Sequence, residues 1–132
     1  MGLGSVSAQE SKTITFDTPG ADTKPGDYNG TYPSSINARG VIAGSNQDAS
    51  GTCHGFLRSP DGEFTTFDAA GADLTPGGYN GTSPSSVNDR GVIAGWYTDA
   101  SRFNHGFLRS PTEISNHLTS LAQAVTDHFR LR

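Results

Sequence analysis

Residues 36–44 read INARGVIAG, and residues 87–95 read VNDRGVIAG. The two stretches start 51 positions apart, and the match extends without a gap from residues 15–60 to residues 66–111. About two positions in three are identical over this length, and a period in this range is typical of proteins built from repeated structural units. The chain is therefore a duplication, and its fold is expected to consist of two copies of one unit.

Each copy is expected to form short β-strands separated by turns. Short runs with alternating or apolar character, bounded by Gly, Pro, Asn and Asp, indicate such strands. The first copy is predicted to hold four strands, at residues 34–37, 41–46, 53–59 and 64–68. The second copy repeats the first three of them, at residues 85–88, 92–97 and 104–110.

Four short strands in an up-and-down meander, repeated at this period, are the pattern of a β-propeller blade. One more strand candidate, TITFD at residues 13–17, precedes the first copy and corresponds by spacing to residues 64–68. This is the strand type that the second copy lacks. The predicted fold class is therefore all-β, with β-propeller-type four-stranded blades, two blades per chain, and a C-terminal α-helix.

Two blades are too few to close a ring, because closed propellers have at least about four. An incomplete blade also leaves strand edges that can pair with another chain. We therefore expect a homo-oligomer in which the strand from Thr13 to Asp17 of one chain completes the second blade of its neighbour. Such a head-to-tail contact either closes or polymerises. A trimer with six blades is preferred over two or four chains.

The sequence divides into an N-terminal arm or leader remnant at residues 1–12, the two-repeat segment at 13–111, and an amphipathic helix at 112–132. Residues 6–8 (VSA) before Gln9 resemble the end of a secretory signal, but the basic and apolar regions that normally precede it are absent, so leader and disordered arm both stay open. Ser115 or Asn116 can cap the helix. Its apolar residues fall on one face: Leu118, Leu121, Val125 and Phe129.

The composition of the chain limits which kinds of partner and cofactor are expected. Thirteen acidic and nine basic residues give a net charge of -4, which argues against a nucleic-acid partner. The single cysteine, Cys53, cannot form an internal disulfide, and Asn104 takes its place in the second copy. Because no run approaches the roughly 18 apolar residues that cross a bilayer, no membrane span is expected. Nothing in the sequence calls for a metal or another cofactor.

Both copies carry a His-Gly-Phe-Leu motif, at residues 54–57 and 105–108, preceded by Asn-x-x-Gly-x-Ile-x-Gly. These motifs resemble the bacterial extracellular repeats known as the HAF family, and the segments 16–21 and 67–72 look like the strand-to-loop segment of the same family. The resemblance implies secretion or surface exposure and a propeller-like fold, and no assigned activity. Two departures are that members usually carry many more repeats and have shorter loops.

The repeated histidines, His54 and His105, are candidate ligands or general bases. Neither has a carboxylate or a second histidine at the local spacing that zinc or catalytic sites usually show. We therefore favour a structural role, in which each histidine ties a strand to a neighbouring loop. Arg39 and Arg90 are interpreted in the same way, as residues that hold a turn or pair with a carboxylate such as Asp17 or Asp68.

The loops between the strands offer a carbohydrate site. Aromatic rings stack on the apolar face of a sugar while amides and carboxylates bind its hydroxyls, and binding residues favour loops on a rigid scaffold. The alternative is that the tyrosines fill the gap between blades and the Asn-Gly pairs make turns. Trp96 and Phe103 are either a ligand platform or, as we prefer, the seam between chains. The candidate ligand-binding residues are Asp22, Tyr28, Asn29, Asp73, Tyr79, Asn80 and Trp96.

The sequence thus favours a secreted, non-enzymatic binding module of a bacterium, lectin-like, with carbohydrate as the preferred ligand. A purely structural, self-assembling minimal propeller without a ligand is the alternative. A hydrolase in the propeller funnel is the third choice, because no nucleophile is paired with a base in the sequence.

Overall fold

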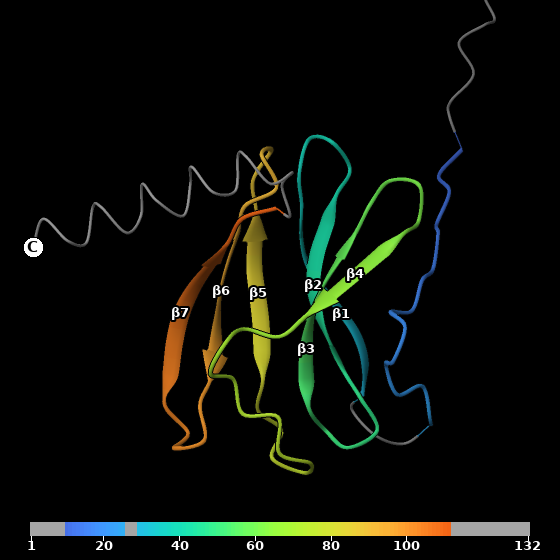
Figure 1. The fold of residues 1–132 in the computed structure, drawn as a ribbon. Coiled ribbons are helices and arrows are strands. Elements are labelled where there is room, and N and C mark those ends of the chain that lie inside the picture. Colours follow the sequence, from blue (N-terminus) through green and yellow to red (C-terminus); the bar gives the residue numbers. More distant parts are fainter. Residues whose placement is uncertain (1–9, 26–28, 112–132) are drawn as a thin grey trace, which may run out of the picture.

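The computed structural model describes residues 10–25 and 29–111, and this part of the chain is all-β without a helix. Seven strands form two antiparallel sheets, one for each repeat (Figure 1). The first sheet has the order β1-β2-β3-β4, and the second has the order β5-β6-β7. Consecutive strands are neighbours within each sheet, so the predicted up-and-down meander is confirmed.

The strands match the two repeats position by position. The first sheet consists of β1 (Gly30–Ile36), β2 (Ile42–Gln47), β3 (Cys53–Arg58) and β4 (Phe64–Phe67). The second sheet consists of β5 (Thr82–Val87), β6 (Ile93–Thr98) and β7 (Asn104–Arg109).

The first strand of each sheet begins earlier than the sequence predicts, at Gly30 and Thr82. A proline lies in each of them, and the pairing register shifts directly after Pro33 and after Pro84. Since a proline lacks an N–H donor, strands tolerate it at edges and bulges. Both strands are edge strands of their sheets, so the prolines that suggested a loop are accommodated there.

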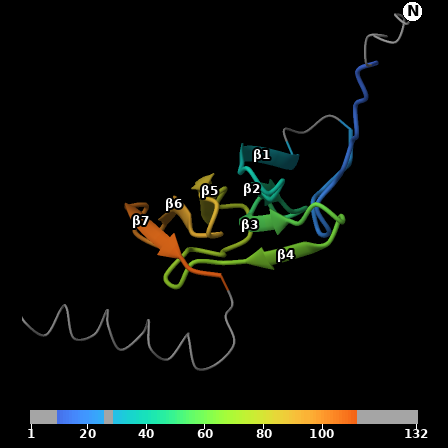
Figure 2. The ribbon, with the colours of Figure 1, turned by 90° about the horizontal axis from the view of Figure 1, so that it is seen from above.

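The segment from Thr13 to Asp17 was expected to be a strand, and in the described chain it pairs with no strand. Its ring at Phe16 nevertheless packs on Phe56 and Phe64, with centroid distances of 6.2 and 5.9 Å. This ring packing, together with the hydrogen bond from the Thr18 amide to the Thr31 hydroxyl, holds the segment against the first sheet. Figures 1 and 2 show this segment, in blue, on the side of the first sheet that faces away from the second.

The core lies between the two sheets. Ala43 of β2 packs with Val87 of β5 and Ile93 of β6, and these three side chains are at most 5% exposed. Leu57, Phe67 and Phe107 surround them and are partly buried. In the first sheet Ala43 lies opposite Leu57, so one face of that sheet contributes both residues to the core. This small apolar centre joins the repeats into one unit.

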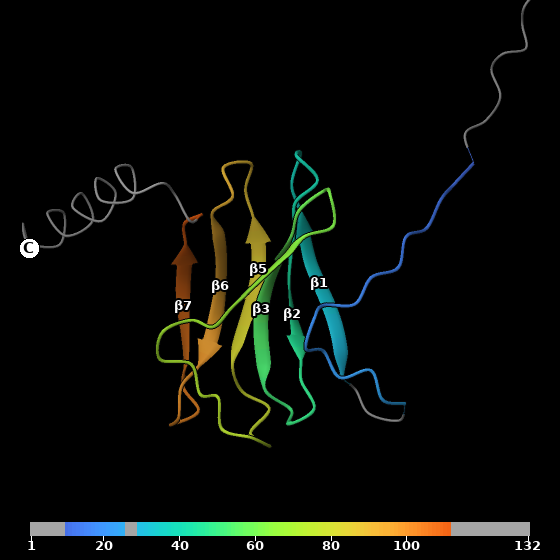
Figure 3. The same cartoon turned by 45° about the vertical axis from the view of Figure 1, so that its right-hand side comes forward.

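Polar contacts between β1 and β5, and between the turns that follow these two strands, add to this packing. Figure 3 shows the ribbon of both sheets from a second side. The Ser34 hydroxyl donates to the carbonyl of Pro84 at 2.7 Å, and the Asn37 side-chain amide donates to the carbonyl of Asn88 at 2.8 Å. The Ala38 amide donates to the Asp89 carboxylate at 2.9 Å. These contacts fix how one repeat stands against the next.

Two expectations about the ends of the chain fall on residues that the structure does not describe. The predicted helix at 112–132 lies outside the described residues, and so do the first nine residues of the predicted arm at 1–12. Within the described ranges, no helix is long and apolar enough to cross a membrane.

Candidate functional site

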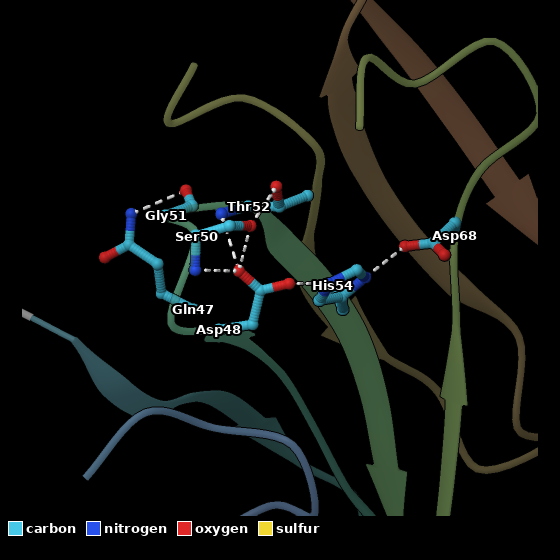
Figure 4. A network of polar contacts seen from close by, with 7 residues as sticks. All are labelled: Gln47, Asp48, Ser50, Gly51, Thr52, His54 and Asp68. Carbon is cyan, nitrogen blue, oxygen red and sulfur yellow. Dashed lines mark hydrogen bonds and ion pairs between the residues drawn. The ribbon is translucent and has the colours of Figure 1, made fainter. Parts of the chain in front are cut away.

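The most connected polar group in the first repeat centres on His54 at the start of β3 (Figure 4). Its Nε2 lies 2.9 Å from Oδ2 of Asp48, in the β2–β3 turn, and its Nδ1 lies 2.6 Å from Oδ1 of Asp68, which follows β4. One ring therefore joins a hairpin turn to the start of the connection toward the second sheet.

Asp48 organises the turn that holds the histidine. Its Oδ1 accepts hydrogen bonds from the amides of Ser50 and Thr52 and from the Ser50 hydroxyl, at 2.7 to 3.0 Å. Desolvation alone would raise the pKa of Asp48, but the hydrogen bonds from Ser50, His54 and Thr52 outweigh it and lower the pKa from 3.8 to about 2. Asp48 is therefore ionised at any pH near neutral.

The two carboxylates also act on the histidine. Partial burial by itself would lower the pKa of His54, but the hydrogen bonds and charges of Asp48 and Asp68 raise it above its ordinary value of 6.5. Both ring nitrogens are engaged, so the ring has no free nitrogen with which to deprotonate a nucleophile. The arrangement supports the structural role that the sequence suggested, in which His54 ties a strand to a loop.

The second repeat builds half of the same group. His105 Nε2 lies 2.8 Å from Oδ2 of Asp99, which corresponds to Asp48. The ring stacks on Tyr97 at 5.1 Å between centroids and touches Phe103 at 4.9 Å. Within the described residues, Nδ1 of His105 has no counterpart of Asp68. The two histidines therefore differ in their second carboxylate.

A pocket of about 390 Å³ opens beside His54. Asn46, Asp48 and Asp68 contribute to its lining together with Pro19 and Phe67. The carboxylates already bind the histidine, and the described residues contain no group of three or more His, Cys, Asp or Glu side chains placed to hold a metal ion.

The loops predicted to bind sugar have the same internal bond in both copies. Asn29 donates to Asp22 at 2.7 Å, and Asn80 donates to Asp73 at 2.9 Å. The structure thus brings each predicted amide and carboxylate together. Tyr28, the aromatic residue predicted for the first copy, lies outside the described residues.

Tyr79, the aromatic residue of the second copy, is 70% exposed and has a positive φ of 57°. One edge of its ring lies over Gly51, where an added Cβ would be 3.0 Å from the ring. The loop around it is fixed to the first repeat, because the Cys53 amide donates to the carbonyl of Asn80 at 2.8 Å and the Gly77 amide donates to that of Ser50. Tyr79 is therefore an exposed ring on a well-anchored loop.

Trp96 is not part of that loop. It lies in the middle of β6, 45% exposed, and no described contact joins it to Tyr79 or Asn80. Its neighbour Ala94, two residues earlier on the same face of the strand, is also exposed. Trp96 therefore belongs to the open face of the second sheet, and its role at a seam between chains stays a prediction.

The two arginines of the β1–β2 and β5–β6 turns, Arg39 and Arg90, form no ion pair with any carboxylate in the described part of the chain. Instead, Asn37 Oδ1 accepts from the amides of Arg39 and Val41 at 2.9 Å. Asn88 does the same in the second copy. The asparagine, not the arginine side chain, holds each turn.

Sequence reasoning missed Asp48 and Asp68 as partners of His54. A signal for Asp48 existed, because an aspartate precedes each histidine by six residues, as Asp48 and as Asp99. A separation of six across a hairpin turn brings two side chains together only if the turn has the right length, and the sequence alone did not fix that length.

Comparisons with known proteins add no relative: no protein-family model, no curated protein and no solved structure matches this chain.

Proposed function

We propose that this protein is a secreted, non-enzymatic binding module for carbohydrate, with the ring of Tyr79 as the surface on which a sugar stacks. A location outside the bacterial cell is part of this proposal and rests on the resemblance to HAF repeats. The observation that carries it is the combination of exposure and backbone conformation at Tyr79.

A positive φ costs a residue with a side chain about 1–2 kcal/mol, and glycine or asparagine would occupy this position at lower cost. Aromatic residues in such a conformation on an exposed loop are candidates for function, because strained residues concentrate at binding sites. A ring held in advance also loses little freedom when a ligand stacks on it.

Polar groups for sugar hydroxyls lie in the same loop. The Asp73 carboxylate binds Thr75 and Asn80, and these hydrogen bonds lower its pKa, so the group is charged and orientated near neutral pH. Asp73 Oδ1 already accepts two hydrogen bonds from Thr75, whereas Oδ2 accepts one from Asn80 and can accept a further one. A pyranose stacked on Tyr79 would therefore find an acceptor within the same loop.

The test is a glycan array probed with the full chain and with three variants. Tyr79→Asn removes the ring and keeps a residue that tolerates positive φ, so the fold is expected to stay intact while binding falls at least about tenfold. Tyr79→Phe should retain most of the binding. Leu74→Ala, which truncates another exposed residue of the loop, is the matched control. Failure of the folded chain to bind any glycan, or equal binding by Tyr79→Asn, would overturn the proposal.

A second candidate is the purely structural role, a self-assembling propeller without a ligand. One observation favours it: the face of the second sheet that carries Ala94 and Leu108 is exposed, and its counterpart in the first sheet, with Ala43 and Leu57, belongs to the core. A chain that forms a discrete oligomer and ignores every glycan would support this role over the first.

A further inference from the structure

The N-terminal segment lies against the first sheet in the same way as the link after β4 lies against the second. Phe16 meets Phe56 at 6.2 Å and 76°, and Phe67 meets Phe107 at 6.1 Å and 75°. The Arg58 guanidinium lies 5.0 Å from the centre of the Phe16 ring, and that of Arg109 lies 4.5 Å from the centre of the Phe67 ring.

The backbone repeats this correspondence. The Thr18 amide donates to the Thr31 hydroxyl at 2.9 Å, and the Ala69 amide donates to the Thr82 hydroxyl at 2.9 Å. Four residues further on, the Asp22 amide bonds the carbonyl of Gln47, just as the Asp73 amide bonds that of Thr98. Residues 16–22 thus occupy the place that residues 67–73 occupy one repeat later.

The residues before Phe67 form β4, the outer strand of the first sheet, but the residues before Phe16 have no sheet to join. Meanwhile β7 has a free outer edge within the described chain. In the first sheet the equivalent edge is covered by β4, in the register Gly55↔Phe67, Phe56↔Thr66 and Leu57↔Thr65. The segment before the first repeat is thus a strand candidate without a sheet edge to pair with. The second repeat has a sheet edge, at β7, without a strand on it.

Residues along β7 are less covered than their counterparts in β3. An added Cβ at Gly55 would lie 2.6 Å from the Phe67 ring, whereas at Gly106 the nearest atom among the described residues is a carbonyl oxygen 3.8 Å away. Leu108 is 78% exposed, whereas its counterpart Leu57 is partly buried. Ile14, on the unpaired segment, is 66% exposed.

We propose that the segment Thr13 to Asp17 of a second copy of this chain pairs with β7 in the register Gly106↔Phe16, Phe107↔Thr15 and Leu108↔Ile14. The ring of the second copy's Phe16 fills the space over Gly106, as Phe67 does over Gly55. Its Ile14 covers Leu108, and two large exposed apolar side chains leave water together.

The same register completes the second histidine group. Asp68 directly follows Phe67 and binds Nδ1 of His54, so Asp17, directly after Phe16, would reach Nδ1 of His105 in the other copy. Asp17 is exposed and has no hydrogen bond in the described chain. The half-built group at His105 and the unused carboxylate at Asp17 are thus two parts of one site, divided between copies.

The second sheet of one copy can also pack on the open face of the first sheet of another copy. Val87 and Ile93 are 5% and 0% exposed against the first sheet, whereas their counterparts Ile36 and Ile42 border an open apolar pocket of about 390 Å³ with Phe16. Stacking another copy's second sheet there would repeat the contact already made inside the chain. The segment cannot reach its own β7, because the first sheet stands between them (Figure 2).

The test measures the mass of the full chain by light scattering on a size-exclusion column over a range of concentrations. The expected mass is a whole multiple, greater than one, of 13.8 kDa. Gly106→Val, which meets open space in a single copy but blocks the Phe16 ring of another, should give a single chain. Ile14→Lys should do the same, since a buried charge opposite Leu108 is unfavourable. Asp17→Asn should weaken assembly about tenfold.

Complementation separates this interface from a general loss of fold. The Ile14→Lys chain keeps an intact β7, and the Gly106→Val chain keeps an intact N-terminal segment, so an equimolar mixture should give a complex of one chain of each. Leu108→Glu is the replacement if Gly106→Val does not fold, as judged by urea unfolding. A single-chain mass for the unchanged protein would overturn the proposal. So would an unchanged oligomer in both variants, which would assign assembly to another surface, such as residues 112–132. Neither result depends on glycan binding.

Discussion

The two sheets have nearly the same sequence and differ in what covers them. The first sheet has a fourth strand, a buried Phe56 and a histidine held between two carboxylates. The second has three strands, a Phe107 that is only partly buried and a histidine with one carboxylate. Residues that are identical in sequence thus have different environments. The contribution of a side chain to the stability of this fold therefore depends on which repeat precedes or follows it.

The largest difference in stability is expected between substitutions of Phe56 and of its counterpart Phe107. Phe56→Ala removes a fully buried ring that contacts Phe16 and Phe64, and large-to-small changes of this kind lower the free energy of unfolding by about 3–5 kcal/mol. Phe107→Ala should cost about half as much, because that ring is partly exposed. Urea unfolding of both variants checks this order, and equal losses would contradict the asymmetry between the sheets.

The glycines before these rings give the next largest contrast. Gly55→Val places its side chain against the Phe67 ring and should lower the free energy of unfolding by about 1–3 kcal/mol. Gly106→Val meets no close atom of the described chain, so a single chain should lose little stability. Both variants are compared by urea unfolding at low concentration. A comparable loss in the two would show that Gly106 is also covered within one chain.

The His54 group should make the stability of the protein depend on pH. Because the pKa of His54 is raised above 6.5, its contribution is complete below pH 6.5 and is lost as the pH rises through the raised value. Because the pKa of Asp48 is lowered from 3.8 to about 2, its contribution is complete above pH 3.8 and is lost as the pH falls toward 2. Stability should therefore be highest between about pH 4 and 6.5.

Substitution tests this profile. Asp48→Asn should lower stability at pH 5 by about 1 kcal/mol, a value reduced by solvent screening, and should flatten the acid side of the curve. Asp99→Asn is the control and should change the curve less, because its partner His105 is more exposed than His54 and binds one carboxylate in the described chain. If the Asp99 variant loses more stability than the Asp48 variant, the doubly held His54 is not the stronger group.

The smallest effect is expected at the turn after β6. Arg102 has a φ of 66°, and its counterpart Gly51 has a φ of 87°. Arg102→Gly should raise the free energy of unfolding by a few tenths of a kcal/mol, since relief of strain exceeds the added freedom of the unfolded chain. Gly51→Arg should lower it, because the new Cβ would meet the Tyr79 ring. Thermal unfolding of both variants, with opposite signs of the shift, is the check.

The repeat itself made most of the fold predictable. Alternation and turn residues located the seven strands, and the order within each sheet followed from short connections. The starts of β1 and β5 were missed because Pro33 and Pro84 look like loop residues until their edge position is known. The absence of a partner strand for residues 13–17 within the described chain agrees with the expectation, and the pairing of this segment with a second copy stays a prediction.

The candidate sites were less predictable. The pairing of Asp22 with Asn29 and of Asp73 with Asn80 joined residues that the sequence had already grouped. The partners of His54 depend on the length of a turn and on where β4 ends, which are properties of the folded backbone. The anchoring of Tyr79 over Gly51 is a contact between repeats, and periodicity within one repeat carries no information about it.

The single thiol of the protein lies where the repeats meet. Cys53 begins β3, and its amide is bonded to the carbonyl of Asn80 in the loop that leads to β5. Burial, with the charge of Asp48, raises the pKa of this thiol, so the reactive thiolate is scarce while the sheets stay together. A thiol reagent would therefore react more slowly with Cys53 while the two repeats are together than after they separate. Labelling of Cys53 would thus report on the contact between the two repeats.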